Sequence, residues 1–139
     1  MAYIESQGLD EIIGMLESSG NLLSEASDEI LLAGAEIYQE EWIAAANAAV
    51  KTNPSEMIAS IAASGKPRTV KGVRRIDVYP TGKNDKGVRN AYIAFVHNYG
   101  SARYTGSRFV DVAEKKGTQR FEKKAEEIWQ QKLQQKGLT

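Results

Sequence analysis

The stretch from residue 90 to residue 113 constrains the fold of this chain more than any other part of the sequence. An apolar run over residues 91–96 stops at Gly100, a short polar loop follows, and Phe109 restarts the apolar pattern. The chain therefore leaves the core at the glycine, crosses a surface loop and re-enters the core through the phenylalanine. Because loops held in place by a core carry function more often than the elements that they join, we expect the functional residues in this stretch.

The conformation of residues 90–99 is open to two interpretations, since a short apolar run fits a buried strand as well as a buried helix. Asn90 as an N-cap and Gly100 as a stop favour a helix, whereas the β-branched and aromatic residues between them favour a strand. We prefer the helix.

Apolar residues recur at helical spacing over much of the rest of the chain. The expected helices cover residues 9–19, residues 21 or 24 to about 51, and residues 53–65, the last with Pro54 in its first turn. Residues 73–80 instead alternate between two faces, which predicts a strand. The polar segment that follows, residues 81–87, is expected to be a mobile loop.

The C-terminal part predicts one more helix with an apolar stripe. The stripe consists of Phe121, Ala125, Ile128, Trp129 and Leu133. Gly137 is a natural end, and Gly117 is expected to separate this helix from a short turn at residues 109–115. Trp42 and Trp129 each lie on the apolar stripe of a predicted helix, so both are expected in the core.

These elements predict a single α+β domain over residues 1–139, with N-terminal helices packed on a small antiparallel β-sheet and closed by a C-terminal helix. A chain of 139 residues that is 42% hydrophobic and 26% charged has the composition of an ordinary globular domain. The sequence has no cysteine, which excludes disulfides and cysteine-ligated metals. With no apolar run that could span a membrane and no signal peptide, we expect a protein used or assembled inside a cell.

Charge is distributed unevenly although the net charge is zero. Residues 1–50 contain ten acidic residues and no lysine or arginine, so residues 51–139 carry all 18 basic residues and the other eight acidic ones. Two arrangements fit this asymmetry: acidic helices paired with basic elements of the same chain, or head-to-tail contacts between subunits. We prefer pairing within the chain.

No catalytic, metal or cofactor site is predicted. The single histidine, His97, has no cysteine or carboxylate near it in sequence, and a metal site needs several ligands. No phosphate-binding loop or nucleophile elbow is present. We therefore expect a protein that is not an enzyme and needs no cofactor.

The region from residue 66 to residue 89 is strongly basic. Its basic residues are Lys66, Arg68, Lys71, Arg74, Arg75, Lys83, Lys86 and Arg89, set against Asp77 and Asp85. Such a cluster can contact nucleic-acid backbones, yet only Tyr79 supplies an interleaved aromatic ring. A charged hairpin that pairs with acidic elements is the preferred interpretation.

The segments 94–101 and 108–110, together with Ala113, carry a resemblance to a known family. An apolar segment ends in an aromatic-Gly-small tip, here Tyr99-Gly100-Ser101, and a Phe then enters a C-terminal helix. This pattern resembles the tail-completion, or tail-to-head joining, proteins of long-tailed bacteriophages and prophages. Many members have an acidic residue where this chain has Asn98.

The resemblance implies a structural virion protein that joins the phage tail to the head connector. By the resemblance, such a protein would form a homo-oligomeric ring, a hexamer, that contacts the tail tube or tail terminator protein and the head connector. It would be located in the virion tail or neck and assembled in the bacterial host cytoplasm, with no membrane partner. Lys83 and Lys86 would then line a channel and contact passing DNA non-specifically.

The interface residues expected for this role lie on and after the tip. They are Tyr99, Gly100, Arg103, Tyr104 and Arg108. Tyrosine and arginine are frequent anchors of protein interfaces, which is the reason for selecting them.

Two other functions fit parts of the sequence. A small metal-independent ribonuclease of the toxin type would use His97, Arg103, Tyr104 and Arg108, but an acidic half-chain would repel RNA. A basic nucleic-acid-binding accessory protein would use the cluster at residues 66–89, with affinity that falls steeply with salt.

Overall fold

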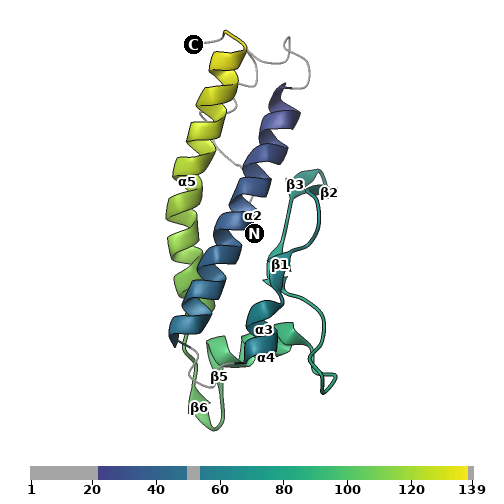
Figure 1. Cartoon of the computed structure of the whole chain (residues 1–139), viewed down its shortest axis with the longest axis vertical. Helices are drawn as coiled ribbons and strands as arrows, with labels where there is room; N and C mark the ends of the chain where they lie inside the picture. Colours follow the sequence, from purple (N-terminus) through teal and green to yellow (C-terminus); the bar gives the residue numbers. More distant parts are fainter. Residues whose placement is uncertain (1–21, 50–53, 138–139) are drawn as a thin grey trace.

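The computed structural model describes residues 22–49 and 54–137. Two long helices, α2 (Leu22–Ala49) and α5 (Phe109–Gln135), lie side by side along the length of the molecule (Figure 1). The elements between them in sequence are α3 (Ser55–Ala59), β1 (Ile61–Ala63), β2 (Arg68–Val70), β3 (Val73–Arg75), β4 (Val78–Pro80), α4 (Asn90–Tyr99), β5 (Gly100–Ser101) and β6 (Tyr104–Thr105). The α+β class is confirmed, while the expected helix over residues 9–19 lies outside the described residues.

The α2–α5 pair encloses the larger of two apolar clusters. It joins Ala26, Ile30, Leu31, Ala35 and Tyr38 of α2 to Phe121, Ile128, Trp129 and Leu133 of α5, with Ile76 from the strand region. These are the stripes read from the sequence, so the second and last helices and the buried position of Trp129 are confirmed.

A second cluster holds the other end of α2 to α3, α4 and the start of α5. Its buried members are Ala46, Met57, Ile58, Ile61, Ala94 and Phe109. Trp42 packs against this cluster with its ring edge-on to Phe109, at 6.0 Å between ring centroids. The helix expected over residues 90–99 is therefore present, and its Ala94 is anchored in this core.

The expected break at Gly117 is wrong, because α5 runs through this position without interruption. Gly117 is buried against α2, and a Cβ there would lie 2.5 Å from Cδ1 of Tyr38. The Tyr38 hydroxyl also hydrogen-bonds the Thr118 hydroxyl at 2.8 Å. The glycine is a packing residue, and helix–helix contact offsets its conformational cost of about 1 kcal/mol.

Two boundaries in the middle of the chain also differ from expectation. The third helix ends at Ala59, because buried Ile61 begins β1, which pairs antiparallel with β4. The expected strand over residues 73–80 is divided at Ile76 and Asp77. Its first part pairs with β2 and its second with β1, so the antiparallel sheet is a set of two-stranded pairs.

The segment expected to be a mobile loop, residues 81–87, forms a hydrogen-bonded turn. The side-chain oxygen of Asn84 accepts hydrogen bonds from the backbone amides of Lys86 and Val88, at 3.0 and 2.9 Å. A backbone bridge between Lys83 and Arg89 closes the turn. Neither described part of the chain, residues 22–49 or 54–137, contains a helix long and apolar enough to cross a membrane.

Candidate interaction site on helix α4

Helix α4 presents an unusual division of polar and apolar side chains. Its buried residues are Asn90, Ala94 and Asn98, spaced by one helical turn on the side facing the second core cluster. The opposite side carries Tyr92, Phe95 and Tyr99, which are 62%, 58% and 52% exposed. We call these three residues the aromatic face.

The aromatic face is a continuous surface feature. The rings of Phe95 and Tyr99 are 4.7 Å apart between centroids. Next to them, a shallow hollow is lined by Val88, Arg89, Ala91, Tyr92 and Phe95. Scattered exposed apolar residues are ordinary, but a contiguous apolar patch on a folded domain marks a site of interaction.

Asn98 fixes the end of α4 and the path of the chain after it. Its side chain is only 1% exposed, and its Oδ1 accepts a hydrogen bond from the Val110 amide at 2.9 Å. Its carbonyl oxygen accepts a second from the Arg108 amide at 3.0 Å. The carboxamide thus satisfies a free N–H in the first turn of α5, which ties two helices together.

The β5–β6 hairpin leaves the core between these two anchors. Gly100 has a φ of +91°, a conformation that L-residues rarely adopt, and it pairs with Thr105 across the hairpin. At Gly106 a Cβ would lie against the Asn98 carbonyl and 2.6 Å from the Gly100 nitrogen. The two glycines allow the hairpin to fold closely against the end of α4.

The structure brings two of the expected interface residues into direct contact. The Arg108 guanidinium lies over the Tyr99 ring, 5.0 Å from its centroid, and it also pairs with Asp111 at 3.7 Å. Arg103 is exposed in the turn of the hairpin, and Tyr104 pairs with Ser101 through the backbone. Gly100, Arg103 and Tyr104 therefore belong to the hairpin, while Tyr99 belongs to the aromatic face.

Sequence reasoning missed Tyr92 and Phe95 as candidate site residues. The signal was present, because Tyr92, Phe95 and Tyr99 follow the i, i+3, i+7 spacing of one helical face. It was ambiguous because such a stripe more often faces the core. In this helix the small Ala94 and two asparagines occupy the core side instead.

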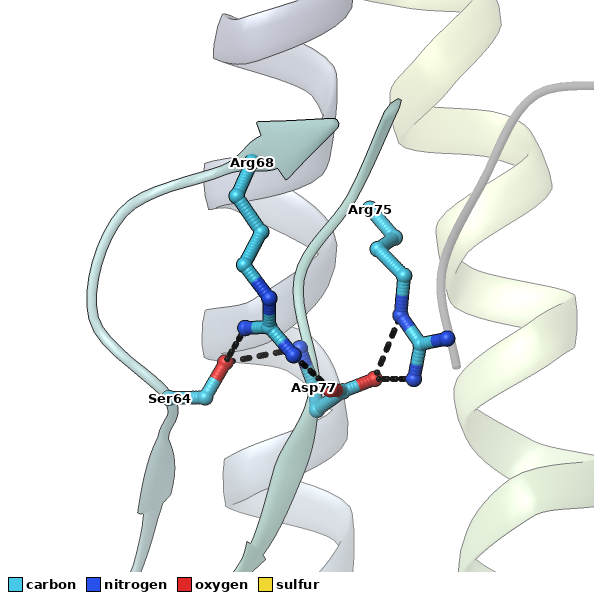
Figure 2. Close-up of polar contacts among 4 residues, drawn as sticks. All are labelled: Ser64, Arg68, Arg75 and Asp77. Carbon is cyan, nitrogen blue, oxygen red and sulfur yellow. Dashed lines mark hydrogen bonds and ion pairs between the residues drawn. The ribbon is translucent and has the colours of Figure 1, made fainter. Parts of the chain in front are cut away.

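The basic region at residues 66–89 is partly neutralised within the chain. Figure 2 shows Arg68 and Arg75, opposite each other on β2 and β3, both directed at Asp77, with N–O distances of 2.8 and 2.6 Å. Ser64 completes the group by accepting hydrogen bonds from Arg68 and from the Asp77 amide. Burial alone would raise the pKa of Asp77, but the hydrogen bonds from Arg75 and Arg68 outweigh it and lower the pKa below its usual value.

Ion pairs also connect α2 to the basic half of the chain. Asp28 binds Arg74 through both carboxylate oxygens, at 2.8 and 2.9 Å, and these hydrogen bonds lower the pKa of Asp28. The remaining pairs are Glu29 with Lys132 at 2.8 Å, and Glu40 and Glu41 with Arg120 at 2.9 Å each. The preferred interpretation of the charge asymmetry, pairing within the chain, is confirmed for these residues.

Lys83 and Lys86 lie exposed on the turn that precedes α4. Neither takes part in an ion pair found among residues 22–49 and 54–137. Through the backbone bridge between Lys83 and Arg89, the turn that carries both lysines is joined to the residue directly before α4.

His97 lies on the last turn of α4 and is half-buried. Burial lowers its pKa below the ordinary value of 6.5, which favours the neutral imidazole at pH 7. Its carbonyl oxygen accepts hydrogen bonds from both the amide and the hydroxyl of Ser107. In the part of the chain that the structure describes, no group of three or more histidine or acidic side chains is arranged to hold a metal ion.

No protein-family model matches the chain, and neither a curated protein nor a solved structure matches it.

Proposed function

We propose that this chain is a structural virion protein that joins a phage tail to the head connector as one subunit of a homo-oligomeric ring. The observation that carries the proposal is the aromatic face, three large exposed rings on one side of a helix whose other side is buried. The resemblance of residues 94–101 and 108–110 to tail-completion proteins supplies the biological setting.

The arrangement of buried and exposed side chains on α4 supports a role in binding another protein molecule. Asn98 and Ala94 are buried and anchor the helix to the core, so the backbone that carries the rings is in place before a partner covers them. A large aromatic side chain buries about 150–250 Å² when fully covered. Because 52–62% of each of the three is exposed, a partner that covers them would bury about a third to a half of one side of a standard interface of about 800 Å². Tyrosine beside arginine, as in Tyr99 and Arg108, is typical of energetic hot spots.

In this proposal the ring is a hexamer in the virion neck, assembled in the bacterial host cytoplasm. One side of the ring contacts the tail tube or tail terminator protein and the other contacts the head connector. The exposed Lys83 and Lys86 face the channel and meet passing DNA through salt-sensitive contacts with phosphate. No step in this role needs catalysis or a cofactor.

The test is the mass of the purified protein, measured by light scattering across a concentration series, alone and with isolated tail tubes. We expect wild type to form closed rings, or to do so once tail tubes are added, and Tyr99→Ala to lose this assembly. Leu32→Ala removes an equally exposed apolar residue from α2 and serves as the control, since Leu32 is 49% exposed. A wild-type chain that stays monomeric and binds no tail tubes would refute the proposal.

A further inference from the structure

The surroundings of the aromatic face are positively charged. Residues 86–110 contain Lys86, Arg89, Arg103 and Arg108 and no acidic residue. Arg89 lines the hollow beside Tyr92, and Arg108 lies over Tyr99, with Asp111 as its acidic neighbour. A partner for this surface is therefore expected to combine apolar side chains with acidic ones.

This charge disfavours a symmetric contact between two aromatic faces. In such a contact the same patch of both copies meets around a twofold axis. Arg89 and Arg108 of one copy would then approach the arginines of the other around an apolar centre, which like-charge repulsion opposes. An acidic surface of a different part of the molecule fits better.

The acidic residues of α2 are largely committed within the chain. Asp28, Glu29, Glu40 and Glu41 pair with arginine or lysine side chains. The other acidic block is the N-terminal segment, residues 5–17, which contains no basic residue. Its acidic residues are Glu5, Asp10, Glu11 and Glu17.

The N-terminal segment also carries the apolar pattern that the aromatic face requires. Leu9, Ile12, Ile13 and Leu16 follow the i, i+3, i+4, i+7 spacing of an amphipathic helix. A helix of this kind binds by laying its apolar stripe into an apolar surface, with its charges toward the rim. The acidic side chains of the segment and the arginine side chains around the aromatic face then have complementary charge.

The length of the chain determines which copy can supply the segment. Residue 22 starts α2, whereas α4 packs beside Ala46 near the other end of that helix (Figure 1). That separation is about 36 Å at 1.5 Å per residue. From Leu16 to residue 22 a fully extended chain spans only about 20 Å, and a helix from Leu9 to Leu16 would add about 11 Å. Bound as a helix, the segment therefore falls short of the aromatic face of its own chain.

We infer that the aromatic face of α4 binds the N-terminal segment of a second copy of this chain. The inference rests on the proposed function, because it names the partner of the same site. Each copy offers its segment to one neighbour and its aromatic face to another, which is a head-to-tail contact. Such contacts give a ring where the rotation between neighbours closes on itself, as the proposed function requires.

The experiment compares two double variants of the full-length chain by sedimentation velocity. Ile12→Ser with Leu16→Ser disables the segment and leaves the aromatic face intact. Tyr92→Ser with Phe95→Ser disables the aromatic face and leaves the segment intact, and both positions are exposed, so folding is preserved. Each variant alone is expected to weaken self-association at least tenfold, while the control Leu32→Ser associates as wild type does.

Mixing the two variants in equal amounts gives the decisive measurement. One chain then offers only a segment and the other only an aromatic face, so we expect one-to-one dimers that grow no further. Segment variants that associate like wild type, or a mixture that forms no dimer although wild type associates, would overturn the inference.

The same samples separate this inference from the proposed function. If wild type forms rings and binds tail tubes but the segment variant does so equally well, only the inference fails. If wild type neither associates nor binds tail tubes, the proposed function fails and this partner assignment fails with it.

Discussion

The two ends of α2 use the same kinds of side chain in opposite ways. Along the α2–α5 pair, Tyr38, Phe121 and Trp129 are buried between the helices, and the charges outside them pair across the chain. At the other end, α4 buries two asparagines and leaves Tyr92, Phe95 and Tyr99 at the surface. The first region is complete within one chain, whereas the second exposes apolar surface that a partner can cover.

This difference separates stability from interaction. Burial of apolar surface stabilises a fold by about 25 cal/mol for each Å², and the helix pair obtains that contribution by itself. The exposed rings on α4 contribute little to the stability of the isolated chain, but their apolar surface can still stabilise a complex when a partner buries it. Substitutions of buried core residues should therefore change the free energy of unfolding, whereas substitutions on the aromatic face should change association with a partner.

The largest effect is expected at Phe109, which packs near α4 and, unlike Phe95 on that helix, is buried. Phe109 is 0% exposed and packs against Trp42, so Phe109→Ala removes a buried ring and leaves a cavity. We expect the free energy of unfolding to fall by about 3–5 kcal/mol. Urea denaturation followed by circular dichroism measures this change. A loss below about 1 kcal/mol would show that the second cluster is not a true core.

Gly117 tests the close approach of the two long helices. Gly117→Ala raises helix propensity by about 1 kcal/mol, yet its Cβ would lie 2.5 Å from Cδ1 of Tyr38. We expect the clash to prevail and the free energy of unfolding to fall by about 1–3 kcal/mol.

The control for Gly117→Ala is the same substitution in a Tyr38→Leu background, where the ring is absent. There alanine should be neutral or stabilising, because only the propensity gain remains. Equal destabilisation in both backgrounds, by the same urea measurement, would contradict the packing role of Gly117.

Gly117 also illustrates how far the sequence predicts the fold. Helical periodicity predicted α2 and the last part of α5, because stripes such as Phe121 to Leu133 report directly which face is buried. For α4 periodicity left helix and strand open, and the residues at its ends favoured the helix. It predicted a break at Gly117, since a glycine that ends a helix and one that admits a tyrosine ring look alike in sequence. Spacing along a chain does not show what the neighbouring helix places opposite.

The same limit applies to the candidate site. The sequence pointed to Tyr99 and Arg108 because tyrosine and arginine are frequent interface anchors, and in the structure these two side chains do meet. It missed Tyr92 and Phe95, since only the tertiary position of Ala94 and Asn98 determines which side of α4 faces the core. The pairing of Arg68 and Arg75 with Asp77 likewise depends on strand register.

Acid titration tests two groups of ion pairs, Asp28 with Arg74 and Asp77 with Arg68 and Arg75. The pKa values of Asp28 and Asp77 are lower in the folded chain than the ordinary value of 3.8. Their stabilisation is therefore fully present well above that value and is lost as pH falls through it toward the lower folded pKa.

At pH 7 we expect Asp77→Asn to lower the free energy of unfolding by about 1 kcal/mol, because Arg68 and Arg75 lose their carboxylate. Below about pH 4 the difference in the free energy of unfolding between the variant and wild type should become smaller as wild-type Asp77 protonates. Urea unfolding at a series of pH values measures this, with Asp85→Asn as an exposed control outside these pairs. If this free-energy difference stayed constant down to pH 2.5, the stabilisation by Asp77 would not come from its ion pairs.

The smallest effect on stability is expected at Phe95, and it completes the comparison with Phe109. Phe95 is 58% exposed, so Phe95→Ser should change the free energy of unfolding by no more than about 0.5 kcal/mol. The same variant should weaken self-association, because serine removes apolar area that only a partner covers. Urea denaturation and sedimentation velocity on one preparation give both values. If Phe95→Ser instead destabilised the isolated chain as much as Phe109→Ala, the aromatic face would be part of the core, and the distinction between buried and exposed aromatic residues around α4 would not hold.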